Sequence, residues 1–253
     1  MLSMGPVFKN HVHGGSQKIL REIAIYLGNQ GHTVNIYCTR RDDNQKVFEL
    51  NQGVTVYPTL GFKQTFPLPY KTSPHNLTEI IQVLSNESKL HDVIYAHDSN
   101  MNFPFLYTDV PTVFSLRDFL YQETLVGAFN FEGDEIIVNS EYTFKCLMQT
   151  VGQIREGLEE RVHLISNGID TNHFKKTKPN AIYNLMDIKE SSRPIILSPH
   201  RPEQTKGIEE TLQLIYLLKE RGMEDVLLLI PRYIDLNISS EPENFYLKIK
   251  TIA

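Results

Sequence analysis

Apolar and polar positions along the chain alternate between two periods. Residues 33–39 alternate and are rich in branched side chains, which predicts a strand, and Gly31 supplies the left-handed stop of the element before it. That earlier element is a predicted helix, in which apolar side chains recur at helical spacing at Ile19, Leu20, Ile23, Ala24 and Leu27. With a short opening strand in "MLSMGPVF", the pattern predicts a βαβ unit.

The same cycle recurs along the next part of the chain. We expect strands at residues 54–57, 92–97, 111–116, 135–139 and 162–166. We expect helices at 75–89 and 102–107, and a further helix that Ser140 can cap. Strands that alternate with helices predict an α/β fold with a mostly parallel sheet covered on both faces.

The composition changes at residues 167–194, which are polar, rich in lysine and end in proline, as is typical of a connection between domains. A second βαβ unit follows, with predicted strands at 195–198 and 226–230, a helix at 208–221 and a last helix capped from Ser240. We therefore expect three regions: a Rossmann-like domain at 1–172, a connection at 173–193 and a partial second domain at 194–253.

Composition narrows the class of protein. The 253 residues are 41% hydrophobic and 22% charged, which argues against a disordered or fibrous chain. The net charge of -5 provides no general basic field for nucleic acid. Cys38 and Cys146 lie in apolar contexts and are interpreted as packed thiols. Without a recognisable leader or membrane span, a cytoplasmic location is the default expectation.

Two cations follow the first strand of the second domain. Arg201 and Lys206 precede a helix that begins at Gly207 or Ile208. A helix N-terminus favours anions, and a guanidinium and an ammonium group complete a clamp for a diphosphate. The alternative is a solvated basic loop, which accounts for most surface arginines and lysines.

Gly14 and Gly15 occupy the matching position in the first domain, directly before a helix. Two facing domains could close both elements over one diphosphate. Metal binding by His11 and His13 is disfavoured, because no carboxylate or cysteine accompanies them. The absence of G-x-G-x-x-G and G-x-S-x-G motifs argues against a nicotinamide enzyme and against a common α/β hydrolase.

Three stretches carry a resemblance. "HGGSQKILREIAIYLGNQGHTVNIY", "VHLISNGIDTNHF" and "ILSPHRPEQTKGIEETL" resemble, in this order, motifs of the family 4 glycosyltransferases of the GT-B fold. The last is similar to the family's R-x-x-x-x-K-G loop. The resemblance implies retaining transfer of a sugar from a nucleotide-sugar donor, usually without a metal or other cofactor, in a cleft between two Rossmann-like domains.

The resemblance also implies roles for individual residues. Arg201 and Lys206 would hold the donor diphosphate and stabilise the leaving group, and Gly14 and Gly15 would offer backbone N–H groups to the phosphates. The acceptor side of the cleft would be lined by His97, Asp98, Arg117, Asp118 and Ser140. Many members of the family have a histidine where this chain reads "FSLRDF", and an arginine can orient an acceptor but cannot shuttle its proton. A structural role capping a strand end remains an equal alternative for His97.

One family motif is missing. Relatives carry two glutamates in an E-x7-E motif that binds the donor sugar and ribose, and the only pair with that spacing here is Glu79 and Glu87. Both lie in a predicted helix of the first domain, so we reject them as the motif. We therefore expect an incomplete, truncated enzyme, with a catalytically silent binding fragment as the alternative. The sugar, the nucleotide and the acceptor stay open, as does peripheral contact with a membrane.

Overall fold

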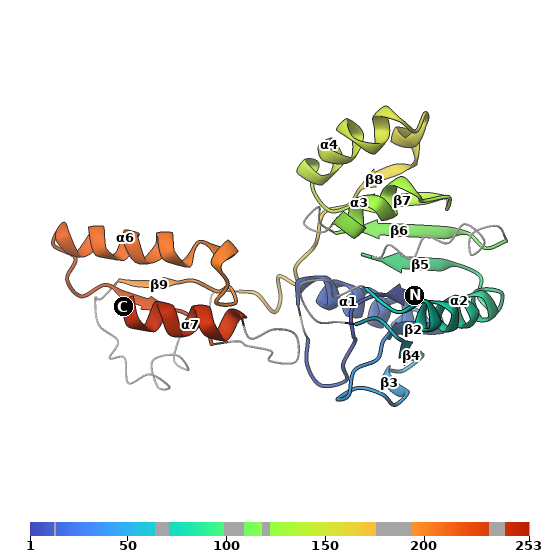
Figure 1. Ribbon diagram of the computed structural model, residues 1–253, viewed down its shortest axis with the longest axis horizontal. Coiled ribbons are helices and arrows are strands. Elements are labelled where there is room, and N and C mark those ends of the chain that lie inside the picture. The colour runs from blue at the N-terminus through green and yellow to red at the C-terminus, as the bar shows by residue number, and fades with distance from the viewer. Residues whose placement is uncertain are drawn as a thin grey trace. The chain divides into compact units, whose positions relative to one another are not determined.

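The computed structural model describes residues 1–12, 14–63, 71–98, 109–117, 122–175, 194–232 and 241–252. The chain divides into two compact units, Met1–Ile169 and Asp170–Ala253 (Figure 1). The helix predicted at 102–107, His13, Asp118 and the proposed cap Ser240 lie outside the described residues.

Unit 1 is built on an eight-stranded sheet with the order β3-β4-β2-β1-β5-β6-β7-β8. Every neighbouring pair is parallel except β3 and β4, which are antiparallel. The strands are β1 (Leu2–Ser3), β2 (Val34–Thr39), β3 (Phe48–Asn51), β4 (Val54–Leu60), β5 (Ile94–His97), β6 (Thr112–Leu116), β7 (Glu135–Val138) and β8 (Val162–Leu164). The carboxyl ends of the seven parallel strands therefore meet at one edge of the sheet, as predicted for an α/β fold.

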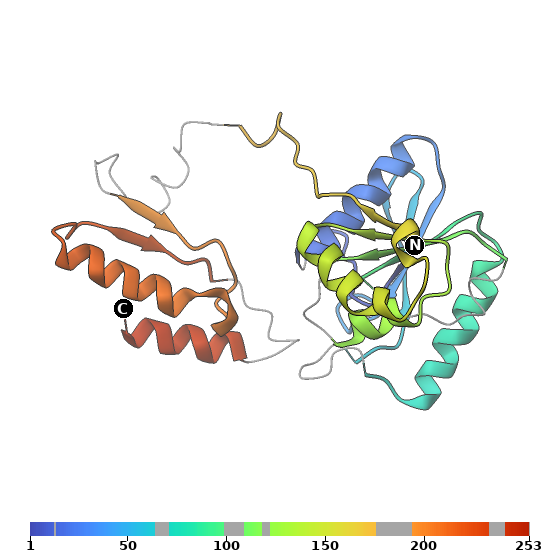
Figure 2. The ribbon, with the colours of Figure 1, turned by 90° about the horizontal axis from the view of Figure 1, so that it is seen from above.

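Helices cover both faces of this sheet (Figure 2). On one face, Leu20 and Ala24 of α1 (Gly15–Asn29) pack against Ile36 of β2. On the other face, Ile80 of α2 (Pro74–Ser88) packs in a cluster with Tyr37, the next residue of the same strand. Successive side chains of a strand point to opposite faces, so α1 and α2 lie on opposite sides of the sheet.

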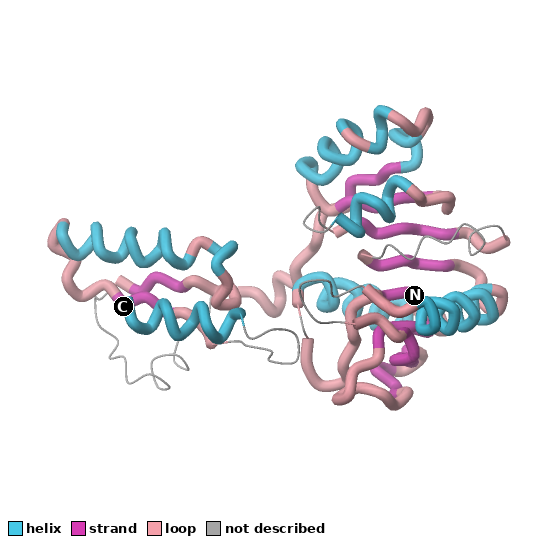
Figure 3. Tube along the Cα trace, in the orientation of Figure 1, coloured by secondary structure: helices cyan, strands magenta, loops and turns pink. Residues whose placement is uncertain are grey.

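Two further helices cover the second half of the sheet (Figure 3). Ala128 of α3 (Gln122–Phe129) and Leu147 of α4 (Glu141–Gln149) share a core cluster with Phe114 and Ile136. Two short 3-10 helices, η2 (Val151–Gln153) and η3 (Leu158–Arg161), lead from α4 to β8. Ser140 caps α4 as expected, since its hydroxyl accepts a hydrogen bond from the amide of Thr143 at 3.1 Å.

Gly28 sits where α1 crosses the turn before β4. A Cβ atom at this position would lie 2.7 Å from both the carbonyl oxygen of Gln52 and the Cγ2 atom of Val54. We expect Gly28→Ala to destabilise the chain by about 1–3 kcal/mol, because overpacking outweighs the gain of about 1 kcal/mol from helix propensity. Urea denaturation measures this, with Gly15→Ala in the same helix as the control. Equal stability of the two variants would contradict this packing.

Unit 2 contains the parallel strands β9 (Ile195–Leu197) and β10 (Leu227–Leu229) among its described residues. Helix α6 (Ile208–Glu220) connects them and α7 (Glu241–Ile252) follows. Ile208, Phe245 and Ile249 are buried together between the two helices. The connection β9-α6-β10 is the second βαβ unit that the sequence predicts. None of the helices in the described part of the chain is long and apolar enough to cross a bilayer.

Candidate functional site

The strand order in the sheet of unit 1 reverses at β1, because later strands are added on both sides of it. The chain passes from β1 through α1 to β2 on one side, whereas β5 pairs with β1 on the other. In open α/β sheets, ligands bind at such a point, outside the carboxyl ends of the strands. Gly14, Gly15 and Ser16 begin α1 beside this point, and Asp98 directly follows β5. Gly14, Gly15 and Ser16 form the candidate donor site of unit 1, and Asp98 lies next to it among the strand ends predicted for the acceptor side.

The fold itself does not require glycine at Gly14 or Gly15. The backbone of Gly14 is extended, with φ at -169°, and Gly15 is the first residue of α1. A Cβ atom on Gly15 would meet no atom within 4 Å, and one on Gly14 would meet only the side-chain oxygen of Gln17, at 3.4 Å. Space above Gly15 is therefore open, and a ligand can reach the helix backbone there.

The N-terminus of α1 offers free hydrogen-bond donors. The first intrahelical bond runs from the amide of Lys18 to the carbonyl of Gly14. No side chain caps the helix and no acidic residue lies in its first turn. Among the described residues, the amides of Gly15, Ser16 and Gln17 have no acceptor. Three free N–H groups at the positive end of a helix dipole attract an anion.

Ser16 ties this helix to the end of β5. Its hydroxyl donates to Oδ2 of Asp98 at 3.0 Å and also lies 3.0 Å from Nε2 of His97. Nε2 is 2.8 Å from the carbonyl oxygen of Ser16, which can only accept, so Nε2 carries the proton. Nδ1 is then the acceptor for the hydroxyl of Tyr95 at 3.1 Å. This network fixes the position of α1 relative to the sheet.

His97 belongs to the protein interior. Its side chain is 1% exposed, and burial lowers its pKa to about 3, with a further contribution from the nearby Arg117 guanidinium. The ring is therefore neutral at physiological pH, and both its nitrogens are hydrogen-bonded within the protein. The structure places His97 behind Ser16 and Asp98 rather than on an open surface.

We expect His97 to make the stability of the chain depend on pH. The unfolded chain takes up a proton near the ordinary histidine pKa of about 6.5, whereas folded His97 stays neutral down to about pH 3. The free energy of unfolding should therefore fall by up to about 1.4 kcal/mol per pH unit as the pH drops below 6.5. His97→Gln should flatten this slope in urea denaturation at pH 7 and pH 5. An unchanged slope would show that His97 titrates normally.

Arg117, at the end of β6, joins the next strand ends. Its guanidinium donates to Oδ1 of Asn167 at 2.9 Å and to the hydroxyl of Tyr95 at 3.1 Å. Its own carbonyl accepts from Nδ2 of Asn139 at 2.9 Å. Nε of Arg117 is buried and has no partner among the described residues. Arg117, Asp98 and Ser140 all follow strands at the same sheet edge, whereas Asp118 lies outside the described residues.

The two cations predicted for phosphate binding lie in unit 2. Both Arg201 and Lys206 are exposed, and Nε of Arg201 lies 3.2 Å from a carboxylate oxygen of Glu203. Lys206 ends the 3-10 helix η4 (Gln204–Lys206), and α6 begins at Ile208 after the left-handed Gly207, as the sequence predicts. The first turn of α6 contains Glu209 and Glu210. These carboxylates reduce the attraction of the helix end for an anion, so Arg201 and Lys206 provide the positive charge of this loop.

His11 and the rejected glutamates have local partners. The ring of His11 stacks on Phe8 with 4.2 Å between ring centroids. Glu79 pairs with His75, while Glu87 accepts a hydrogen bond from the hydroxyl of Tyr37 at 2.5 Å. Glu87 is therefore engaged with the sheet and is not simply part of a solvated helix face.

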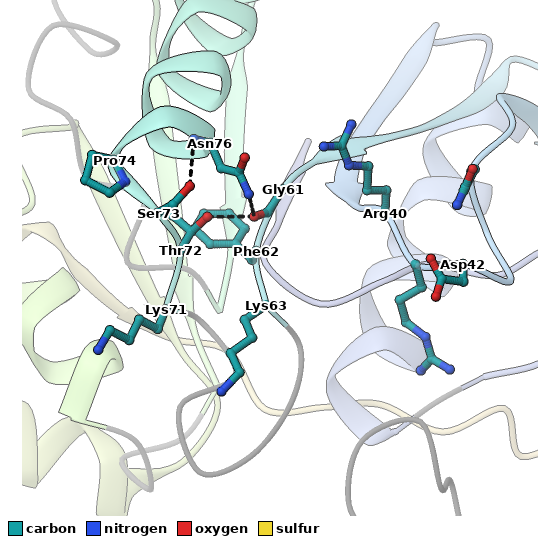
Figure 4. Close-up of a pocket in the computed structure, with 12 residues that line it drawn as sticks. Arg40, Asp42, Gly61, Phe62, Lys63, Lys71, Thr72, Ser73, Pro74 and Asn76 are labelled. Carbon is teal, nitrogen blue, oxygen red and sulfur yellow. Dashed lines mark hydrogen bonds between the residues drawn. The ribbon is translucent and has the colours of Figure 1, made fainter.

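A cavity that sequence reasoning missed opens at the ends of β2 and β4 (Figure 4). Its lining includes Arg40, Lys63 and Lys71, none of which the sequence motifs single out. Arg40 immediately follows a predicted strand, and the rule that ligands bind at carboxyl ends of strands would have drawn attention to it.

The chain was compared with known proteins. No curated protein matches it. A glycosyltransferase from Rickettsia africae is similar in structure, with a TM-score of 0.63, 16% identity, and coverage of 99% of this chain and 63% of that one. Anabaena Alr3699/HepE in complex with UDP is similar with a TM-score of 0.52 and 17% identity, and the match covers 90% of this chain and 67% of that one. The catalytic domain of starch synthase IV from Arabidopsis thaliana, bound to ADP and acarbose, is similar with a TM-score of 0.55 and 14% identity. This match covers 94% of this chain and 76% of that one.

The chain thus spans about two thirds of the length of the first two of these structures. Their likeness confirms the expected α/β fold of the GT-B type. The sequence model of glycosyltransferase family 4 matches residues 13–173, which is more than half of the chain and includes Gly14, Gly15 and the strand ends of unit 1. This chain belongs to glycosyltransferase family 4.

Proposed function

We propose that the chain transfers a sugar from a nucleotide-sugar donor to an acceptor, with retention of configuration at the sugar carbon. The observation that carries this proposal is the N-terminus of α1, where the amides of Gly15, Ser16 and Gln17 have no acceptor in the described part of the chain and no described atom covers Gly15. Such an end suits the phosphates of a nucleotide donor. Membership of the family and the likeness to structures that contain UDP and ADP support this choice of ligand.

Each group has a proposed role in the transfer. The amides of Gly15 and Ser16 bind phosphate oxygens, and Ser16 is held in place by His97 and Asp98. Arg201 and Lys206 neutralise the diphosphate as the bond from the sugar carbon to its oxygen breaks and the electron pair stays on the leaving group. The acceptor oxygen then bonds to the face of the sugar carbon that the diphosphate leaves, and its proton passes to the departing diphosphate oxygen.

The strand ends after β5 and β6 are proposed to position the acceptor. Asp98 has a positive φ of 47°, which is uncommon for a residue other than glycine. Arg117 is anchored at three points through Tyr95, Asn167 and Asn139, so it is suited to orient a polar group. It does not act as a base, because a guanidinium stays protonated at neutral pH.

The proposal is tested by adding UDP-, GDP- and ADP-sugars and measuring both the melting temperature and the release of free nucleotide. We expect one of these donors to raise the melting temperature and to release nucleotide when an acceptor is present. Stabilisation with no nucleotide release under any acceptor condition would indicate a donor-binding module. No response to any of the three donors would contradict the proposed function.

A further inference from the structure

The cavity at the ends of β2 and β4 has a volume of about 620 Å³ and is open to solvent. This is within the range of small-molecule binding sites, roughly 300–1,000 Å³. It lies at the same sheet edge as Gly15, because β2 and β4 are parallel to β1. Its lining comprises Arg40, Arg41, Asp42, Gln45, Gly61, Phe62, Lys63, Lys71, Thr72, Ser73, Pro74 and Asn76.

Hydrogen bonds from two side chains to the carbonyl of Gly61 fix one wall of this cavity. The carbonyl of Gly61 accepts from Oγ1 of Thr72 at 2.7 Å and from Nδ2 of Asn76 at 3.3 Å (Figure 4). A Cβ atom on Gly61 would press against Asn76 at 3.4 Å, so the end of β4 and the start of α2 are in close contact. This wall of the cavity is therefore held by contacts between β4 and α2.

Backbone hydrogen bonds bring three positively charged residues close to Gly61. The amide of Arg40 donates to the carbonyl of Leu60 at 2.9 Å, and the amide of Lys63 donates to the carbonyl of Lys71 at 3.1 Å. The ammonium groups of Lys63 and Lys71 extend to the same side in Figure 4. Three cations are thus brought to one end of β4 by main-chain contacts.

These cations have no carboxylate partners within the described part of the chain. Arg40, Lys63 and Lys71 are all exposed and form no ion pair there. Arg41 differs, because it pairs with Asp43 at 3.0 Å and its guanidinium lies over the ring of Phe8. Asp42 is the only carboxylate in the lining. In a chain of net charge -5, such a cluster is not a by-product of a basic composition.

The N-terminus of α2, which borders the cavity, limits the kinds of ligand that can bind there. Pro74, the first residue of α2, has no N–H, and the amide of Asn76 is already capped by Ser73. An anion would therefore be bound by the lysine and arginine side chains and favoured by the helix dipole, with few backbone donors. The two lysines and the arginine of the lining together carry more positive charge than one carboxylate neutralises, so they favour a group with up to two negative charges, such as a phosphate ester.

We propose that this cavity binds a phosphate group of the acceptor, an inference that rests on the proposed transferase function. Lys63 and Lys71 neutralise the phosphate, and Arg40 adds positive charge from the other side of the cavity (Figure 4). The rest of the acceptor extends along the sheet edge toward the ends of β1 and β5. A soluble phosphate ester and the headgroup of a phospholipid share this chemistry.

The test is a calorimetric titration of the full chain with glycerol phosphate, in parallel with sedimentation of the chain with vesicles of phosphatidylcholine that contain phosphatidylinositol. The double variant Lys63→Ala, Lys71→Ala should weaken phosphate binding at least tenfold, since hydrogen bonds to charged groups are the strongest of their kind. The control Lys89→Ala, Lys145→Ala removes two exposed lysines of unit 1 and should bind like the unaltered chain.

Binding of glycerol phosphate alone identifies a soluble ester, and vesicle binding that the double variant loses identifies a lipid headgroup. Binding of neither ligand, equal binding by the double variant, or equally tight binding of acetate would overturn the inference. A separate titration with the donor distinguishes the two proposals. Phosphate binding without any donor binding would leave this site standing and remove the transferase function, whereas donor binding without phosphate binding would do the reverse.

Discussion

Replacing Gly15 with aspartate is expected to abolish donor binding and to leave the fold at least as stable as before. A Cβ atom at this position meets nothing within 4 Å, so the protein has room for the side chain. A carboxylate in the first turn of α1 interacts favourably with the helix dipole, by about 0.3–1 kcal/mol. The same carboxylate occupies the space above the free amides and repels a diphosphate.

The loss of affinity for the nucleotide-sugar should be at least a hundredfold, about 2.8 kcal/mol. Calorimetric titration with the donor measures it, and urea denaturation measures the stability. Asn86→Asp is a matched control, because it adds the same charge to an exposed position of α2. Gly15→Ala tests the steric effect alone, and its affinity for the donor should lie between the affinities of Gly15→Asp and Asn86→Asp. Unchanged donor affinity in Gly15→Asp would remove the N-terminus of α1 from the donor site.

Removing the side chain of Arg201 or Lys206 should slow transfer by about 100- to 1,000-fold, the range found when one group that stabilises a developing negative charge is deleted. Both side chains are exposed, so the stability of the fold should change by less than about 0.5 kcal/mol. Nε of Arg201 faces Glu203, which leaves the terminal nitrogens of the guanidinium for the donor. Nucleotide release at saturating donor measures the rate.

Lys219→Ala is the control for these variants, since Lys219 is a cation in the last turn of α6, the helix that follows Arg201 and Lys206. It should leave the rate of transfer unchanged. If Arg201→Ala and Lys206→Ala both transfer sugar at the rate of the unaltered chain, these residues are part of a solvated basic loop and have no role in catalysis.

Much of the fold follows from the sequence, and the exceptions have physical causes. The strand β3 (Phe48–Asn51) is not predicted, because its pairing with β4 depends on the tight turn at Gly53, where φ is 74°. Helix α3 (Gln122–Phe129) is not predicted either, since Gly127 and branched residues give it a weak helical pattern. Its burial of Ala128 in the core compensates for that low propensity.

The candidate site is predictable only in part. Gly14, Gly15 and Ser140 could be placed at helix starts, because local patterns set those positions. The anchoring of Arg117 by Asn167 joins residues 50 apart, and no local pattern indicates such a contact. Lys63 and Lys71 meet through one backbone hydrogen bond between irregular segments, so their common cavity emerges only in three dimensions.

The most direct test of the account is an NMR titration of the chain labelled with ¹⁵N-glycine, which has 14 glycines. We expect the amide signal of Gly15 to shift on addition of the nucleoside diphosphate of the active donor, and to stay in place with the corresponding nucleoside, which lacks phosphate. The glycines of the opposite helix end, Gly28 and Gly31, serve as internal references. A signal of Gly15 that does not move at saturating diphosphate would contradict phosphate binding by α1, and with it the proposed donor site.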